Sequence, residues 1–133
     1  MSKVVYIGAF LDVEAQWRLL AAFPPRHALV YGDHVTLCFK PTAEELLHYA
    51  MVVGEEFDLD IAGEAHDEMG QAVLVHNVTT KNKQAHITIS TSPGTKPVYS
   101  NKLAEGIFHP TEHLRLRATI DTYPRTQGEH HGR

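Results

Sequence analysis

Residues 34–39 of the chain are His-Val-Thr-Leu-Cys-Phe, and residues 85–90 are Ala-His-Ile-Thr-Ile-Ser. In both stretches apolar side chains alternate with polar ones, which is the period of a β-strand with one face on a core. Because residues i and i+2 of a strand share a face, each stretch presents an imidazole beside a hydroxyl. The sequence therefore predicts two strands with one apolar face and one face equipped for chemistry.

The alternation assigns the side chains of the two stretches to faces. The polar faces are expected to carry His34, Thr36, Cys38, His86, Thr88 and Ser90. The apolar faces are expected to carry Val35, Leu37, Phe39, Ile87 and Ile89. We interpret Cys38 as a small packing residue rather than a nucleophile, because no base lies beside it in the sequence.

The rest of the chain alternates between strand and helix patterns. Strands are predicted over 4–10, 34–39, 57–62, 72–78, 85–90 and 113–122, and helices over 13–23, 43–52 and 100–105. Residues 81–83 are predicted to form a polar connector. Asp12 is expected to cap the first helix, and Thr42 with Glu45 forms a capping-box motif before the second. Trp17 is expected to lie in the core.

The order of these elements predicts the fold class. Strands dominate and the helices are interspersed among them, so we expect an α+β fold with antiparallel sheet. Each half of the chain has a His-x-Thr-x strand, a proline-containing loop, a helix and an alternating strand. This repeated layout predicts a two-lobed, pseudo-symmetric arrangement of antiparallel sheets with flanking helices.

Length and composition limit the class of protein. The 133 residues suit a single domain over 1–123, and the polar tail at 124–133 is expected to be disordered. Apolar segments are too short for a membrane helix or a signal peptide, so we expect no membrane association. The single cysteine, Cys38, excludes an internal disulfide and indicates a cytoplasmic setting.

Charge narrows the class of ligand. The net charge is −4 with histidine neutral, which argues against binding of extended duplex nucleic acid through many lysine and arginine contacts. It does not argue against one phosphate group in a pocket. The oligomeric state is left open by the sequence.

The two His-x-Thr pairs suit phosphodiester hydrolysis if they face one cavity. A neutral imidazole can take a proton from water, and a protonated imidazole can give one to the leaving oxygen. The threonine hydroxyls can donate hydrogen bonds to the non-bridging phosphate oxygens. We expect His86 to act as the base and His34 as the acid, although the near symmetry leaves the two roles interchangeable.

The paired motifs resemble the 2H phosphoesterase superfamily, which has two His-x-Thr/Ser-x motifs. Residues 86–101 are similar to the corresponding region of the cyclic nucleotide phosphodiesterases of myelin and of tRNA-ligase phosphodiesterase domains. The resemblance implies a two-lobed α+β fold, no metal and no other cofactor, with His34, Thr36, His86 and Thr88 as site residues. It implies hydrolysis of a 2′,3′-cyclic phosphate on a nucleotide or an RNA end.

Several other residues are candidates for the site or for a metal. Lys96 and Tyr99 are substrate-binding candidates, for a phosphate and for base stacking, although an ordinary loop explains them equally well. Ser100 is expected to cap the helix at 100–105 rather than to reach substrate. No metal site is expected at His76, His109 and His113, because His76 lies far along the chain from His109 and His113, which are four positions apart. Arg115 and Arg117 are expected on a solvated face.

Two other functions fit the same residues. One keeps the chemistry and changes the substrate to cyclic oligonucleotide signals or 2′-5′ oligoadenylate. The other is a non-catalytic nucleotide- or RNA-binding module. The intact His-x-Thr pairs count against the second of these.

Overall fold

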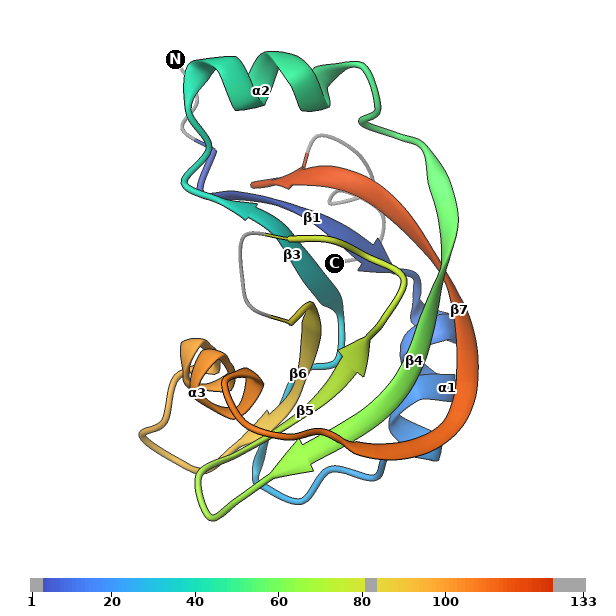
Figure 1. Cartoon of the computed structure of the whole chain (residues 1–133), viewed down its shortest axis with the longest axis vertical. Helices are drawn as coiled ribbons and strands as arrows, with labels where there is room; N and C mark the ends of the chain where they lie inside the picture. The colour runs from blue at the N-terminus through green and yellow to red at the C-terminus, as the bar shows by residue number, and fades with distance from the viewer. Residues whose placement is uncertain (1–3, 81–83, 126–133) are drawn as a thin grey trace.

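The computed structural model describes residues 4–80 and 84–125, and Figure 1 shows their arrangement. In chain order the elements are β1 (Tyr6–Leu11), α1 (Val13–Ala22), β2 (Leu29–Val30), β3 (His34–Phe39), α2 (Ala43–Ala50), β4 (Glu56–His66), β5 (Gly70–Val75), β6 (His86–Thr91), η1 (Pro97–Tyr99), α3 (Ser100–Ala104) and β7 (His109–Tyr123). The predicted connector at 81–83 and the tail beyond 125 lie outside the described residues. No helix within the described ranges is both long and apolar enough to span a membrane.

The strands form one antiparallel sheet that closes on itself. Its order is β2-β6-β3-β1-β7-β4-β5, and a further pairing between β5 and β6 completes a barrel-like ring. The α+β class with antiparallel sheet, predicted from the sequence, is therefore confirmed. The two halves of the sequence pattern correspond to β3–α2–β4 and β6–α3–β7, and within this continuous sheet β3 pairs with β6 and β4 with β7.

The interior of the ring is filled by the apolar face of each strand. Its fully buried side chains include Ile7, Leu59, Ile61, Val35, Val73, Val75, Ile87, Ile89 and Leu116. Both motif strands therefore point their central apolar residue inward. Because successive side chains alternate across a strand, the flanking histidines and threonines face outward.

Two helix starts are formed as the sequence predicts. The Asp12 carboxylate accepts a hydrogen bond from the Ala15 N–H at 2.7 Å, which caps α1. At α2 the Thr42 hydroxyl accepts from the Glu45 N–H at 3.1 Å, and the Glu45 carboxylate accepts from the Thr42 N–H at 2.8 Å. The capping box is thus confirmed in both directions.

The prediction that Trp17 lies in the core is wrong. The Trp17 side chain is 73% exposed, whereas α1 buries Ala15 and Leu19. These two residues and Phe23 recur every four positions, so they form a continuous stripe on one side of the helix. Trp17, two positions after Ala15, points about 200° away from that stripe. Apolar residues therefore occur on two faces of α1, and only the face with Ala15 and Leu19 packs into the core.

The strict alternation predicted for residues 34–39 is also wrong at its end. Ile7 pairs with Cys38 and Gly8 with Thr36, so β3 carries one extra residue, Leu37, in a bulge. The bulge reverses the faces that follow it. Cys38 is buried in the core, and Phe39 is 55% exposed.

Candidate functional site

The two motif strands are neighbours in the sheet, and their pairing is short. Strand β3 pairs with β6 in antiparallel register at a single position, Val35 opposite Ile87. In this register His34 lies across from Thr88, and Thr36 lies across from His86. All four side chains are partly exposed on the outer face. The structure therefore brings the four motif residues predicted from the sequence together in one cluster, which we call the His–Thr site.

The surroundings of the two motifs match each other. Gly8 of β1 lies opposite Thr36, and Ala72 of β5 lies opposite Thr88, with a register shift beside each of them. A Cβ atom at Gly8 would lie 3.0 Å from the Val35 carbonyl oxygen. Small neighbours thus flank both hydroxyls, and a larger side chain at either position would crowd the outer face.

The His86 ring is held in one tautomer by the main chain. Its Nδ1 lies 2.9 Å from the Gln84 carbonyl oxygen, which can only accept, so Nδ1 carries the proton. Burial lowers the pKa of His86 below the ordinary value of 6.5, the Gln84 carbonyl opposes this effect, and the charge of nearby His34 lowers it further. His86 is therefore a neutral imidazole at pH 7, with the Nε2 lone pair available as a base.

The His34 ring is held by a carboxylate and by aromatic stacking. Its Nδ1 lies 2.9 Å from the Asp33 Oδ1 atom. The ring stacks on Tyr6 with centroids 4.9 Å apart and on Phe10 with centroids 5.5 Å apart. Because Nδ1 is engaged, Nε2 is the nitrogen left for chemistry in this ring as well. Asp33, which the motif pattern does not identify, orients the ring through this contact.

An aromatic row continues from His34 along the outer face. Tyr6 stacks on Tyr123 with centroids 5.1 Å apart, and the Arg125 guanidinium lies 4.5 Å from the centre of the Phe10 ring. Burial raises the pKa of Tyr6 above its usual range, so its hydroxyl stays protonated. The Arg125 Nε also lies 3.6 Å from the buried Asp121 carboxylate. Arg125 belongs to the segment predicted to be a disordered tail, and sequence reasoning missed it.

The Thr88 hydroxyl is positioned by α3. It donates to the Ser100 Oγ atom at 2.7 Å, and Ser100 is 1% exposed. The prediction that Ser100 caps this helix is wrong, because the capping position is Tyr99 and no side chain caps the helix there. No hydrogen bond within residues 4–80 and 84–125 engages the Thr36 hydroxyl. The two threonines therefore differ in how firmly they are held.

The two loop candidates lie near η1. Lys96 is exposed immediately before it. The Tyr99 hydroxyl donates to the Asp67 carboxylate, and a Cβ at Gly70 would lie 3.0 Å from the Tyr99 ring. Tyr99 thus ties η1 to the turn between β4 and β5. Substrate binding by Lys96 and Tyr99 stays a prediction.

Arg117, one of the two arginines expected on a solvated face, forms ion pairs there. It contacts Asp58 at 3.0 Å and Glu56 at 3.3 Å, and all three side chains are exposed. Such exposed pairs contribute little to stability. Their role is consistent with the predicted solvated face of β7.

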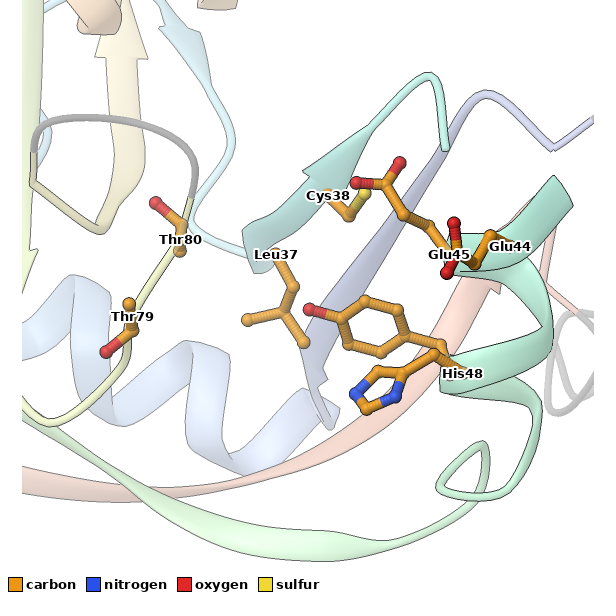
Figure 2. A pocket seen from close by; sticks show the side chains of 8 residues that line it. Leu37, Cys38, Glu44, Glu45, His48, Thr79 and Thr80 are labelled. Carbon is orange, nitrogen blue, oxygen red and sulfur yellow. The ribbon is translucent and has the colours of Figure 1, made fainter. Parts of the chain in front are cut away.

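A separate cavity opens at one end of the closed sheet. Its volume is about 450 Å³, and its lining is Leu37, Cys38, Glu44, Glu45, His48, Tyr49, Thr79 and Thr80. Figure 2 shows α2 with Glu44, Glu45 and His48 on one side and Thr79 and Thr80 on the other. None of the four motif side chains lines this cavity, so it is distinct from the His–Thr site.

Comparisons with known proteins do not assign the chain to a family. A scan against protein-family models finds no match, and a search of curated protein sequences finds no significantly similar one. The function is therefore inferred from the geometry of the site and from the motifs themselves.

Proposed function

We propose that this protein is a metal-independent phosphodiesterase that hydrolyses a 2′,3′-cyclic phosphate on a nucleotide or an RNA end. One observation carries the proposal: two His-x-Thr pairs lie across a single antiparallel seam, each histidine opposite the other motif's threonine. The motifs resemble those of 2H phosphoesterases, which supports the same reaction. Acid, base and phosphate-binding groups then come from four side chains on two adjacent strands.

The reaction assigns one proton transfer to each imidazole. Nε2 of His86 takes a proton from water as the water oxygen bonds to phosphorus. The bond from phosphorus to one ribose oxygen breaks, and Nε2 of protonated His34 gives that oxygen a proton. The product is a phosphate monoester with a free ribose hydroxyl. His86 then holds a proton and His34 lacks one, and exchange with solvent restores the starting states.

The environments of the two rings favour this assignment of roles. Burial lowers the pKa of His86, which keeps it neutral and able to accept a proton. His34 Nδ1 lies 2.9 Å from the Asp33 carboxylate, so a cation on that ring would have an ion-pair partner. Exchanging the roles would place the cation on His86, whose burial disfavours a charge and whose Nδ1 is bonded to a carbonyl oxygen rather than to a carboxylate.

The threonine hydroxyls are proposed to donate to the non-bridging oxygens as negative charge develops on them, and Thr88 does so by turning its proton away from Ser100 Oγ toward the phosphate. Within the aromatic row of Tyr6, Phe10 and Tyr123, the ring of Tyr123 is 48% exposed and is suited to stack a base. The same row would serve a cyclic oligonucleotide or 2′-5′ oligoadenylate, which is the second candidate substrate class. A panel of 2′,3′-cyclic mononucleotides, cyclic dinucleotides and 2′-5′ oligoadenylates, with products separated by chromatography, tests the proposal. Affinity without any product would indicate a binding module instead.

The pH dependence of kcat/KM is expected to be bell-shaped, with its acidic midpoint below pH 6.5. The reason is that the base must be neutral, and burial lowers the pKa of His86 from that value. Initial rates from about pH 4 to 10 on a cyclic nucleotide measure both limbs. A rate that rises steadily to the alkaline end would contradict the two-histidine mechanism.

Folding stability is expected to change with pH through the same group. The folded protein holds His86 with a lowered pKa, so the unfolded chain binds more protons there. This contribution to stability is present above pH 6.5 and is lost as the pH falls through the lowered pKa. Thermal melting of wild type and His86→Gln across this range measures it, because the substitution removes the titrating group.

Turnover is expected to survive excess EDTA, because two imidazoles and two hydroxyls supply acid, base and charge stabilisation without a Lewis acid. The measurement compares initial rates before and after chelation and desalting. Loss of activity that zinc or manganese restores, in protein that remains folded after chelation, would contradict the metal-independent mechanism.

A further inference from the structure

A second cluster of chemically active side chains lies outside the His–Thr site. Asp60 comes from β4, His76 directly follows β5, and His113 comes from β7. One potential ligand atom from each of the three lies within 4.8 Å of the other two. Three separate strands thus bring two imidazoles and one carboxylate to the same point on the outer face.

The contacts within the cluster are centred on the carboxylate. His76 Nε2 lies 2.5 Å from Asp60 Oδ2, and His113 Nδ1 lies 3.0 Å from each Asp60 oxygen. The two rings meet edge to face, with centroids 5.3 Å apart. Both rings therefore make their side-chain hydrogen bonds to the one carboxylate.

Hydrogen bonds of the main chain and of the Asn77 side chain hold Asp60 in place. The His76 N–H donates to the Asp60 carbonyl at 3.1 Å, and the Asp60 N–H donates to the Asn77 side-chain oxygen at 2.9 Å. The Asn77 amide in turn donates to the Asp58 carbonyl at 2.9 Å. Asp60 is 7% exposed, whereas both imidazoles remain about half exposed and have room to rotate. A fixed, buried carboxylate is thus flanked by two adjustable nitrogen ligands.

We propose that Asp60, His76 and His113 bind one divalent transition-metal ion, with zinc as the best match. Two imidazoles and one carboxylate are a ligand set that zinc takes in proteins, with further coordination positions left to solvent. Tetrahedral zinc with bonds of about 2.0–2.1 Å holds its ligand atoms roughly 3.3 Å apart. The separations here, from 2.5 Å up to 4.8 Å, span that value, so rotation of the exposed rings completes the site.

The rival explanation is a hydrogen-bonded cluster that only ties β4, β5 and β7 together. Arg115, which lies opposite Asp60 in the sheet, adds a positive charge nearby. Its side chain is exposed and can turn toward solvent. The rival predicts no metal uptake at these residues, so a binding measurement separates the two.

The metal site lies beside the His–Thr site and is not part of it. Leu74, two residues before His76 on β5, lies opposite His86. None of the four motif side chains belongs to the ligand set. Metal binding at these residues therefore does not depend on the proposed hydrolysis. Loss of the metal is expected to leave turnover unchanged.

The test uses the full chain, stripped of metal with EDTA and desalted, and titrated with zinc chloride by calorimetry. Wild type is expected to bind one equivalent at this site and to melt at a higher temperature with zinc. His76→Gln and His113→Gln alter exposed side chains, so both variants should fold. Each is expected to weaken zinc binding by at least about 100-fold, the upper end of what loss of a residue supporting a metal ligand costs.

His66→Gln is the matched control, because His66 is an exposed histidine on β4 outside the cluster. It should bind zinc as wild type does. Nitrogen chemical shifts should report zinc on Nε2 of His76 and on Nδ1 of His113. No zinc uptake by wild type, or equal affinity in wild type and both cluster variants, would overturn the proposal.

Discussion

Replacement of His34 or His86 by alanine is expected to lower turnover by at least about 100-fold, the low end of what a positioned acid or base supplies. The double replacement should cost much less than the product of the two single effects, because the residues act on one step. Turnover of the three variants on a cyclic nucleotide substrate measures this. Burial is the main cause of the lowered pKa of His86, and the charge of nearby His34 lowers it further, which is the structural reason to expect such coupling.

Folding should change little in these variants. The inward-facing Val35 and Ile87 hold the two strands in the core, whereas the two histidines lie on the outer face. Melting curves of the same proteins, with His66→Ala as a control for loss of an exposed histidine, distinguish chemistry from structure. If activity only followed the folded fraction, the histidines would be structural. Folded single variants with wild-type turnover would end the two-histidine hypothesis.

The sequence predicts the elements well where the pattern is local. Alternation identified both motif strands, and the caps at Asp12 and Thr42 are formed as expected, because a cap depends on residues only three positions apart. The pattern fails where tertiary packing chooses between faces. The exposure of Trp17 and of Phe39 follows from the packing of α1 and from the bulge at Leu37, and neither is encoded in periodicity alone.

The same distinction between local sequence patterns and tertiary contacts applies to the candidate site. The two histidines and two threonines were identifiable because each motif is contiguous in sequence. Residues that orient them, such as Asp33 and Ser100, depend on contacts between elements and gave only turn or cap signals. The Asp60 cluster was missed for a related reason. Its three ligands come from three strands, so no short spacing marks them in the chain.

The hydroxyls are expected to contribute a smaller effect than the histidines. Thr36→Val and Thr88→Val keep the shape of the side chain and remove the donor. Each should lower turnover by roughly 10-fold to 1000-fold, as expected for the loss of one preorganised donor to developing negative charge. Steady-state kinetics should show the loss mainly in kcat, because the hydrogen bond strengthens in the transition state.

The two threonine variants should differ in stability, because only Thr88 is bonded to a buried partner. Thr88→Val leaves the Ser100 hydroxyl without that bond, at a cost of about 1–3 kcal/mol in the free energy of unfolding. Thr36→Val should melt close to wild type. Thr88→Ser restores a hydroxyl and serves as the matched control, so it should recover both stability and turnover. Near-normal turnover in both valine variants would mean that the threonines serve strand propensity and packing rather than phosphate binding.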